Sequence, residues 1–298
     1  TIATTLLWGI AELFYKKGSH EDRKYDHLRV CVLVGAVMGI HAIFTLLTSD
    51  IAYNPMNLVA YLPVSLCYIV SMACSFFGIR FIEESLADPI ENTSGAMCSI
   101  MCVLFLGDKI SLPVWIAIAI IVVGIIGVTQ TEKSAEVNRS QKLGKKLATV
   151  AFLMPFCYAF IDAVGCVLDI FFLEMETSPL IGITEDNIEL VANVSYELTF
   201  AIVGLILFIF MKVKGVKFEL PKQGDKIIAA VCETAGQLTY VYAMSGNGAI
   251  AAPILSSVCV VSLLLSRIFL KEKLTKKQYL FIGIIIVGIL MLAVLEGE

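Results

Sequence analysis

Apolar stretches of about 17 to 25 residues follow one another along this chain, with short polar segments between them. A helix needs about 20 mostly apolar residues to cross the hydrocarbon core of a bilayer. The pattern therefore predicts an all-α membrane protein with ten transmembrane helices. These stretches lie at residues 1–17, 28–47, 57–79, 85–106, 112–129, 147–170, 189–211, 226–243, 249–270 and 277–295.

The composition excludes an ordinary soluble domain, because 58% of the residues are hydrophobic, only 16% are charged and the mean hydropathy is +0.86. The first stretch has no basic region before it and no Ala-x-Ala site after it, so we expect a structural helix and not a signal peptide. The nine cysteines fall inside predicted helices without metal-binding spacing. We interpret them as packing residues and expect no disulfide, metal or cofactor.

An internal repeat divides the chain. Residues 86–124 match residues 250–288 without a gap, at a constant offset of 164. Within them, Phe105–Ser111 corresponds to Phe269–Thr275, a short charged turn between two apolar stretches. Duplication of this kind is typical of secondary transporters. We expect a first five-helix repeat at 1–130, a cytoplasmic linker at 131–146 and a second repeat at 147–298.

The basic residues predict the topology. Of the 22 Lys and Arg residues, all except Lys109 lie in or beside alternate loops, namely those joining helices 1–2, 3–4, 5–6, 7–8 and 9–10. The positive-inside rule makes these loops cytoplasmic, so both termini should be on the other side. Because five helices is an odd number, the second repeat should be inverted relative to the first. Segment 48–57 has no Lys or Arg, whereas its counterpart at 212–226 has five, as inversion requires.

Short motifs give a resemblance to a known family. Gly107–Ser111 and Lys271–Thr275 resemble the turn that precedes the last helix of each repeat in the drug/metabolite transporter superfamily, in its ten-helix EamA-like branch. Trp8 and Gly9 resemble a Trp-Gly pair in the first helix of that branch. The resemblance implies a transporter that binds a small molecule where its two repeats meet.

The same resemblance aligns the first helix with the sixth. Trp8 and Glu12 then correspond to Tyr158 and Asp162, so that an aromatic residue precedes a carboxylate by four positions in both. Residues four apart share one helix face. Under inverted symmetry, the two pairs should face one another across a central cavity.

Further polar residues lie at membrane depth, where a charged group costs about 2.5–3.5 kcal/mol and is functional by default. Glu12 and Asp162 lead the predicted substrate site, together with Glu91, Asn92, Glu233, Gln237, Trp8, Tyr158, Tyr240 and Phe76. His41 and Glu197 are candidates for a proton relay, with helix packing as the alternative for His41. Asp169 should lie at the outer end of its helix.

The sign of these charges indicates the substrate. No Lys or Arg lies in the middle of a predicted helix, and residues 170–190 contain five acids and no basic residue. Carboxylates beside aromatic rings are suited to ammonium groups. We therefore predict a transporter of a small organic cation or amine-bearing metabolite, working by alternating access, in which protons can exchange for substrate.

Three other functions agree less well with the sequence. An exporter of neutral or zwitterionic metabolites, such as amino acids, would use the acids for protons alone. An intramembrane enzyme would need a motif such as GxGD or HExxH, and the sequence has neither. Nucleic-acid binding has no support, because the basic residues are short flanks of helices. We expect a multi-pass protein of the plasma membrane, in contact with lipid and a small-molecule substrate.

Overall fold

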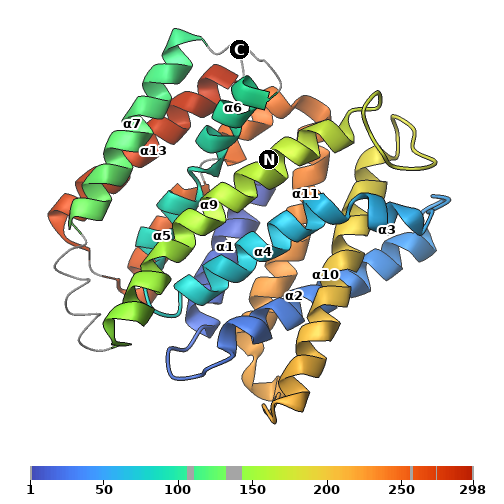
Figure 1. Cartoon of the computed structure of the whole chain (residues 1–298), viewed down its shortest axis with the longest axis horizontal. Coiled ribbons are helices and arrows are strands. Elements are labelled where there is room, and N and C mark those ends of the chain that lie inside the picture. Colours follow the sequence, from blue (N-terminus) through green and yellow to red (C-terminus); the bar gives the residue numbers. More distant parts are fainter. Residues whose placement is uncertain (1, 106–110, 132–142, 256–257, 273, 297–298) are drawn as a thin grey trace.

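The computed structural model describes the chain except residues 1, 106–110, 132–142, 256–257, 273 and 297–298. All regular elements in the described part are helices (Figure 1). Most of the predicted linker at 131–146, and most of the Gly107–Ser111 turn, lie outside the described residues.

The helices are α1 (Ile2–Gly18), α2 (Asp26–Thr48), α3 (Met56–Ala60), α4 (Leu62–Gly78), α5 (Glu84–Glu91), α6 (Ser94–Phe105), α7 (Leu112–Thr131), α9 (Lys145–Leu173), α10 (Ile188–Val213), α11 (Gly224–Leu255), α12 (Val258–Leu265) and α13 (Lys276–Glu296). A 3-10 turn, η1, covers Leu220–Lys222, and a π-helical segment, η2, covers Ser266–Leu270.

Three helices in the described part, α2, α9 and α10, are long and apolar enough to cross a membrane. Shorter apolar helices lie at Leu62–Gly78, Leu112–Gly127 and Val258–Leu270. Many large apolar side chains on them are exposed, including Ile40 and Leu47 of α2. An outer surface of this kind is matched to lipid and not to water.

The prediction of one continuous helix at 85–106 is wrong, because the structure divides this segment into α5 and α6. Pro89 has no backbone N–H to donate and crowds the preceding turn. Just beyond it, the side chain of Asn92 donates to the Asp88 carbonyl at 3.0 Å, and Thr93 donates to the Ile90 carbonyl at 2.7 Å. Side chains that bond these carbonyls compete with the helix, which ends at Glu91.

The boundary predicted between 226–243 and 249–270 is also wrong. The sequence Ser-Gly-Asn-Gly at 245–248 favours a loop, but α11 continues through it to Leu255. In a membrane the backbone groups must satisfy one another, and a continuous helix does so even where glycine is unfavourable. The predicted helix at 57–79 is likewise divided, into α3 and α4.

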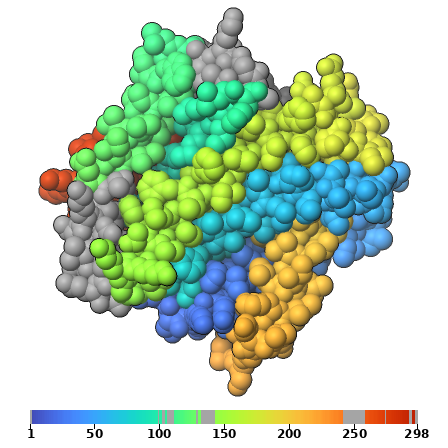
Figure 2. Space-filling model, viewed as in Figure 1, coloured from blue at the N-terminus to red at the C-terminus, as the bar shows by residue number. Residues whose placement is uncertain are grey.

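Four helix pairs make the most extensive contacts: α2 with α10, α7 with α13, α1 with α11, and α4 with α9. Figure 1 shows α7 and α13 side by side, and α2 beside α10. Figure 2 shows α4 and α9 running next to one another across the same face.

Glycines permit the closest of these approaches. A Cβ added to Gly124 of α7 would lie 2.5 Å from Ile285 Cγ1, and one added to Gly288 of α13 would lie 2.6 Å from Ile121 Cγ1. A Cβ on Gly35 of α2 would lie 2.4 Å from the carbonyl oxygen of Phe200 in α10. Small residues at such crossings let membrane helices pack backbone to backbone.

The segments that flank the helices meet at two opposite ends. At one end, Arg29 donates to the Lys217 carbonyl at 3.3 Å, and Glu272 accepts from the backbone of Glu84 and Ser85. At the other end, the Asn57 side chain exchanges hydrogen bonds of 3.0 and 2.7 Å with the backbone of Ile181. The first end, called the basic end below, gathers the loops that the charge pattern placed together. Which end faces the cytoplasm stays a prediction.

Candidate functional site

Carboxylates from four helices gather inside the bundle. Glu12 of α1 lies within electrostatic range of Glu84 and Asp88 of α5 and of Glu233 of α11. Glu91 of α5 lies within range of Glu12, Asp88 and Asp162 of α9. We call Glu12, Glu84, Asp88, Glu91, Asp162 and Glu233 the acidic cluster.

Aromatic rings of α1 and α11 line one side of this cluster. The Trp8 indole packs against α11, where a Cβ on Gly236 would lie 2.6 Å from its Nε1. Its ring centroid is 5.3 Å from that of Tyr240. The Tyr15 hydroxyl donates to Glu233 at 3.4 Å, and the Tyr15 ring packs against Phe76 at 4.5 Å. The absence of a Cβ at Gly236 is what allows the indole to lie so close to Glu233.

Helix α9 brings the second aromatic–acid pair to the same cluster. Tyr158 lies within electrostatic range of Asp162, Glu91, Glu12 and Glu233. The pairs at Trp8/Glu12 and Tyr158/Asp162 therefore share one region of the molecule, with Glu91 between their carboxylates.

The two remaining predicted residues border the cluster. Gln237, one turn beyond Glu233 in α11, is half-buried. Asn92 donates to the Asp88 carboxylate at 2.8 Å.

The acidic cluster and the rings beside it differ in exposure. Glu12, Asp162, Trp8, Tyr158 and Tyr240 keep intermediate exposure. In contrast, Glu84, Asp88 and Glu91 are at most 3% exposed.

Two of these acids, Glu84 and Asp88, were missed by the sequence analysis. They lie at the start of the predicted helix 85–106, where a charged residue is ordinarily interfacial. Their spacing to Glu91, at i, i+4 and i+7, was the available signal, because such residues share one helix face. No group of three or more His, Cys, Asp or Glu residues in the described part has the arrangement of a metal site.

His41 and Glu197 lie apart from the acidic cluster. His41 Nδ1 is 2.8 Å from both carboxylate oxygens of Glu197, where α2 packs against α10. His41 keeps 23% of its side chain accessible and Glu197 none. They form a histidine–carboxylate pair with each other and not with the central acids.

Asp169 lies near the end of α9, as predicted, but its carboxylate is buried there. It is only 8% exposed and accepts hydrogen bonds from the hydroxyls of Tyr61 and Tyr68, the latter at 3.3 Å. Because these tyrosines come from a distant part of the sequence, the pattern of α9 alone does not reveal the burial.

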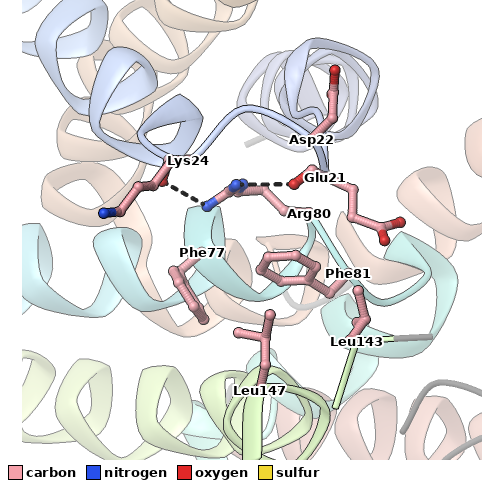
Figure 3. Close-up of a pocket in the computed structure, with 8 residues that line it drawn as sticks. All are labelled: Glu21, Asp22, Lys24, Phe77, Arg80, Phe81, Leu143 and Leu147. Carbon is pink, nitrogen blue, oxygen red and sulfur yellow. Dashed lines mark hydrogen bonds between the residues drawn. The ribbon is translucent and has the colours of Figure 1, made fainter. Parts of the chain in front are cut away.

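A separate pocket of about 590 Å³ opens at the basic end, lined by Glu21, Asp22, Lys24, Phe77, Arg80, Phe81, Leu143 and Leu147 (Figure 3). Arg80 donates to the carbonyls of His20, Glu21, Arg23 and Lys24 and contacts His27 Nδ1 at 3.0 Å. These contacts use the five N–H donors of a guanidinium group. Arg80 therefore holds the 19–25 segment in place and is not available to bind an anion in the pocket.

Comparison with known proteins agrees with this arrangement. The model of the EamA-like transporter family matches residues 1–130 and 177–294, and the chain belongs to that family. It is thus an integral membrane protein of the drug/metabolite transporter type, as the sequence motifs predicted. The chain is also 35% identical over 97 residues to the uncharacterized protein MJ1333.1 of Methanocaldococcus jannaschii, covering 31% of this chain and 71% of that protein.

Proposed function

We propose that this protein is a plasma-membrane transporter of a small organic cation or amine-bearing metabolite, which works by alternating access and exchanges protons for its substrate. The observation that carries the proposal is that three acids of the cluster, Glu12, Asp162 and Glu233, lie beside the rings of Trp8, Tyr158 and Tyr240. A carboxylate together with an aromatic face binds ammonium groups, at about 0.5–2 kcal/mol for each cation–π contact.

The positions of the basic side chains support this choice of substrate. Lys226 pairs with Asp26 at 3.3 Å, and Arg80 bonds the 19–25 segment, both at the basic end. Lys16 lies one turn from Glu12, but its ammonium is directed to the carbonyls of Ile79 and Ile82. An anion carrier would need such groups at the centre, beside its substrate.

The predicted inverted repeat has support from the helix boundaries. Adding 164 to the first residue of α7, Leu112, gives Lys276, which begins α13. The two helices therefore begin at equivalent positions of the sequence repeat.

Reciprocal contacts between α7 and α13 also support it. Gly124 packs against Ile285, and Gly288 packs against Ile121, and each pair is the other shifted by 164. The distances to the facing backbone are equal, at 3.1 Å to the nitrogen of each isoleucine. Contacts that repeat in this way are expected across a two-fold axis.

Contacts between the two proposed halves support alternating access. The five-helix halves at 1–130 and 147–298 contact each other mainly through pairs that the two-fold axis would exchange, such as α1 with α11 and α9 with α4. Rocking of one half against the other would open the central site to alternate sides. Both termini would lie outside the cytoplasm.

Thermal unfolding of the purified chain in detergent tests this function. A ligand that binds the native state stabilises it by RT ln(1 + [L]/Kd), about 2.7 kcal/mol at 100 times its Kd. We expect tetraethylammonium to raise the unfolding temperature, more at alkaline than at acid pH, because protons compete with it for the carboxylates. Glu12→Gln and Asp162→Asn should remove the effect while the protein stays folded.

The matched control is Glu219→Gln, an acid-to-amide change at an exposed loop residue whose pKa is lowered by the neighbouring Lys222. It should leave the stabilisation unchanged. Equal stabilisation of wild type, Glu12→Gln and Asp162→Asn would refute the cation proposal. A response to neutral amino acids and none to tetraethylammonium would favour the alternative substrate class.

A further inference from the structure

Helix α5 carries three acids on one face, and they differ from the rest of the acidic cluster. Glu84, Asp88 and Glu91 follow one another at one-turn intervals and are 0%, 3% and 3% exposed, respectively. Glu12 of α1 lies beside them, within electrostatic range of Glu84 and Asp88.

Five carboxyl oxygens of this group lack a hydrogen-bond partner. They are both oxygens of Glu84 and one each of Glu12, Asp88 and Glu91, all of them buried among the described residues. An unpaired buried charge costs several kcal/mol, and carboxylates that share a buried site repel one another. A bound positive charge would offset both costs.

The size and chemistry of the site identify that charge. A substrate-sized cation has no accessible surface to contact at Glu84 or Asp88, unlike at Glu12, Asp162 and Trp8. The described residues also contain no arrangement of ligands for a metal ion. A proton needs neither an accessible surface nor a set of metal ligands, since two carboxylates can share one proton across a short distance.

We propose that Glu84, Asp88 and Glu91, together with Glu12, form a proton-binding site separate from the place where the substrate binds. The proton site itself does not depend on the proposed transport function. Only its role in coupling protons to substrate rests on that function. Glu12 belongs to both regions, so a proton on the α5 side and a cation on the Trp8 side would compete through it. That competition is a direct means of exchanging protons for substrate.

Titratable and charged groups of the neighbouring elements face α5. They are Glu12 and Lys16 of α1, Cys74 of α4, Tyr158 and Asp162 of α9, Glu233 of α11, Cys259 of α12, Arg267 of η2 and Glu272. Lys16 donates to the carbonyl of Ile82 and Arg267 to the carbonyl of Glu272. The remaining groups are acidic or neutral.

Glu272 caps the first turn of α5 at the basic end. Its carboxylate accepts from the backbone N–H of Glu84 at 3.0 Å and of Ser85 at 2.9 Å, and from the Ser85 hydroxyl. Glu272 belongs to the second half of the chain and α5 to the first. Movement of one half against the other would break these bonds and open the first turn of α5, next to Glu84, to water.

Infrared spectroscopy of the purified full chain tests the site without any substrate, through the carbonyl stretch of protonated carboxyl groups. We expect such a band at neutral pH in the wild type and its loss at alkaline pH. Glu84→Gln and Asp88→Asn should each reduce the band at neutral pH, and Glu219→Gln should not. Thermal unfolding checks that each variant is folded, which we expect because the amides have nearly the same shape as the acids.

Uptake of radiolabelled tetraethylammonium into proteoliposomes tests the coupling. A pH gradient should accelerate uptake by the wild type, and Glu84→Gln should lose this acceleration while it keeps uptake without a gradient. A neutral-pH band that is absent, or that both variants leave intact, would overturn the proton site. If the variants reduce the band but the wild type carries no tetraethylammonium, the proton site stands and the proposed substrate is wrong.

Discussion

The reciprocal contacts of α7 and α13 give a quantitative test of the inverted repeat. An alanine at Gly124 would place its Cβ 2.5 Å from Ile285 Cγ1 and 3.1 Å from the Phe281 carbonyl oxygen. An alanine at Gly288 would place its Cβ 2.6 Å from Ile121 Cγ1 and 3.1 Å from a carbonyl oxygen, that of Ala117. The nearly equal geometry predicts nearly equal costs for the two substitutions.

The expected cost follows from two opposing effects. Overpacking a tight interface costs about 1–3 kcal/mol, because the isoleucine must leave its rotamer or the helices must separate. Replacing glycine by alanine inside a helix returns up to about 1 kcal/mol. We therefore expect each variant to lose about 1–2 kcal/mol of unfolding free energy. The double variant should lose less than the sum, because the first substitution already separates the helices.

Denaturant-induced unfolding in detergent, followed by tryptophan fluorescence, measures these losses. The matched control is Gly283→Ala in the same helix, α13, where an added Cβ would meet nothing within 4 Å. That variant should be neutral or more stable than the wild type. Two outcomes would refute the two-fold relation of α7 and α13. One is a difference between the stability losses of Gly124→Ala and Gly288→Ala that exceeds the loss expected for either variant. The other is a loss in both variants no larger than that of Gly283→Ala.

Two further predictions concern the orientation of the chain and the basic end. In a bacterial host, alkaline phosphatase fused to the C-terminus should be active, and a fluorescent protein that folds only in the cytoplasm should be dark at the same position. The reverse pattern would overturn the orientation derived from Lys and Arg. Arg80→Gln should cost about 2–4 kcal/mol of unfolding free energy, because most of its bonds to backbone carbonyls are lost and net hydrogen bonds contribute about 0.5–1.5 kcal/mol each. Lys222→Gln, at an exposed pair with Glu219, should be near neutral, and an equal loss in both variants would contradict the role assigned to Arg80.

The helical class and the family could be predicted from the sequence because both depend on local pattern. Runs of apolar residues long enough for a bilayer predict helices without knowledge of their neighbours, as at 189–211, which α10 covers. Helix breaks were harder. Asn92 and Thr93 end α5 through their own side chains, whereas the glycines at 246 and 248 lie within α11. Intrinsic helix propensity predicts helix ends poorly where the tertiary surroundings decide whether a helix continues.

Part of the candidate site could also be predicted from the sequence, and part of it could not. Sequence alone determined that this chain has carboxylates at membrane depth, since Glu12, Asp162 and Glu233 each lie within an apolar stretch. The family resemblance aligned Trp8 with Tyr158. It did not identify Glu84 and Asp88, which lie at a helix start and become buried only because α1, α9 and α12 pack around α5. It did not separate the His41–Glu197 pair from the central acids either. The distances between side chains on different helices depend on which helices pack together, and only the tertiary structure decides that.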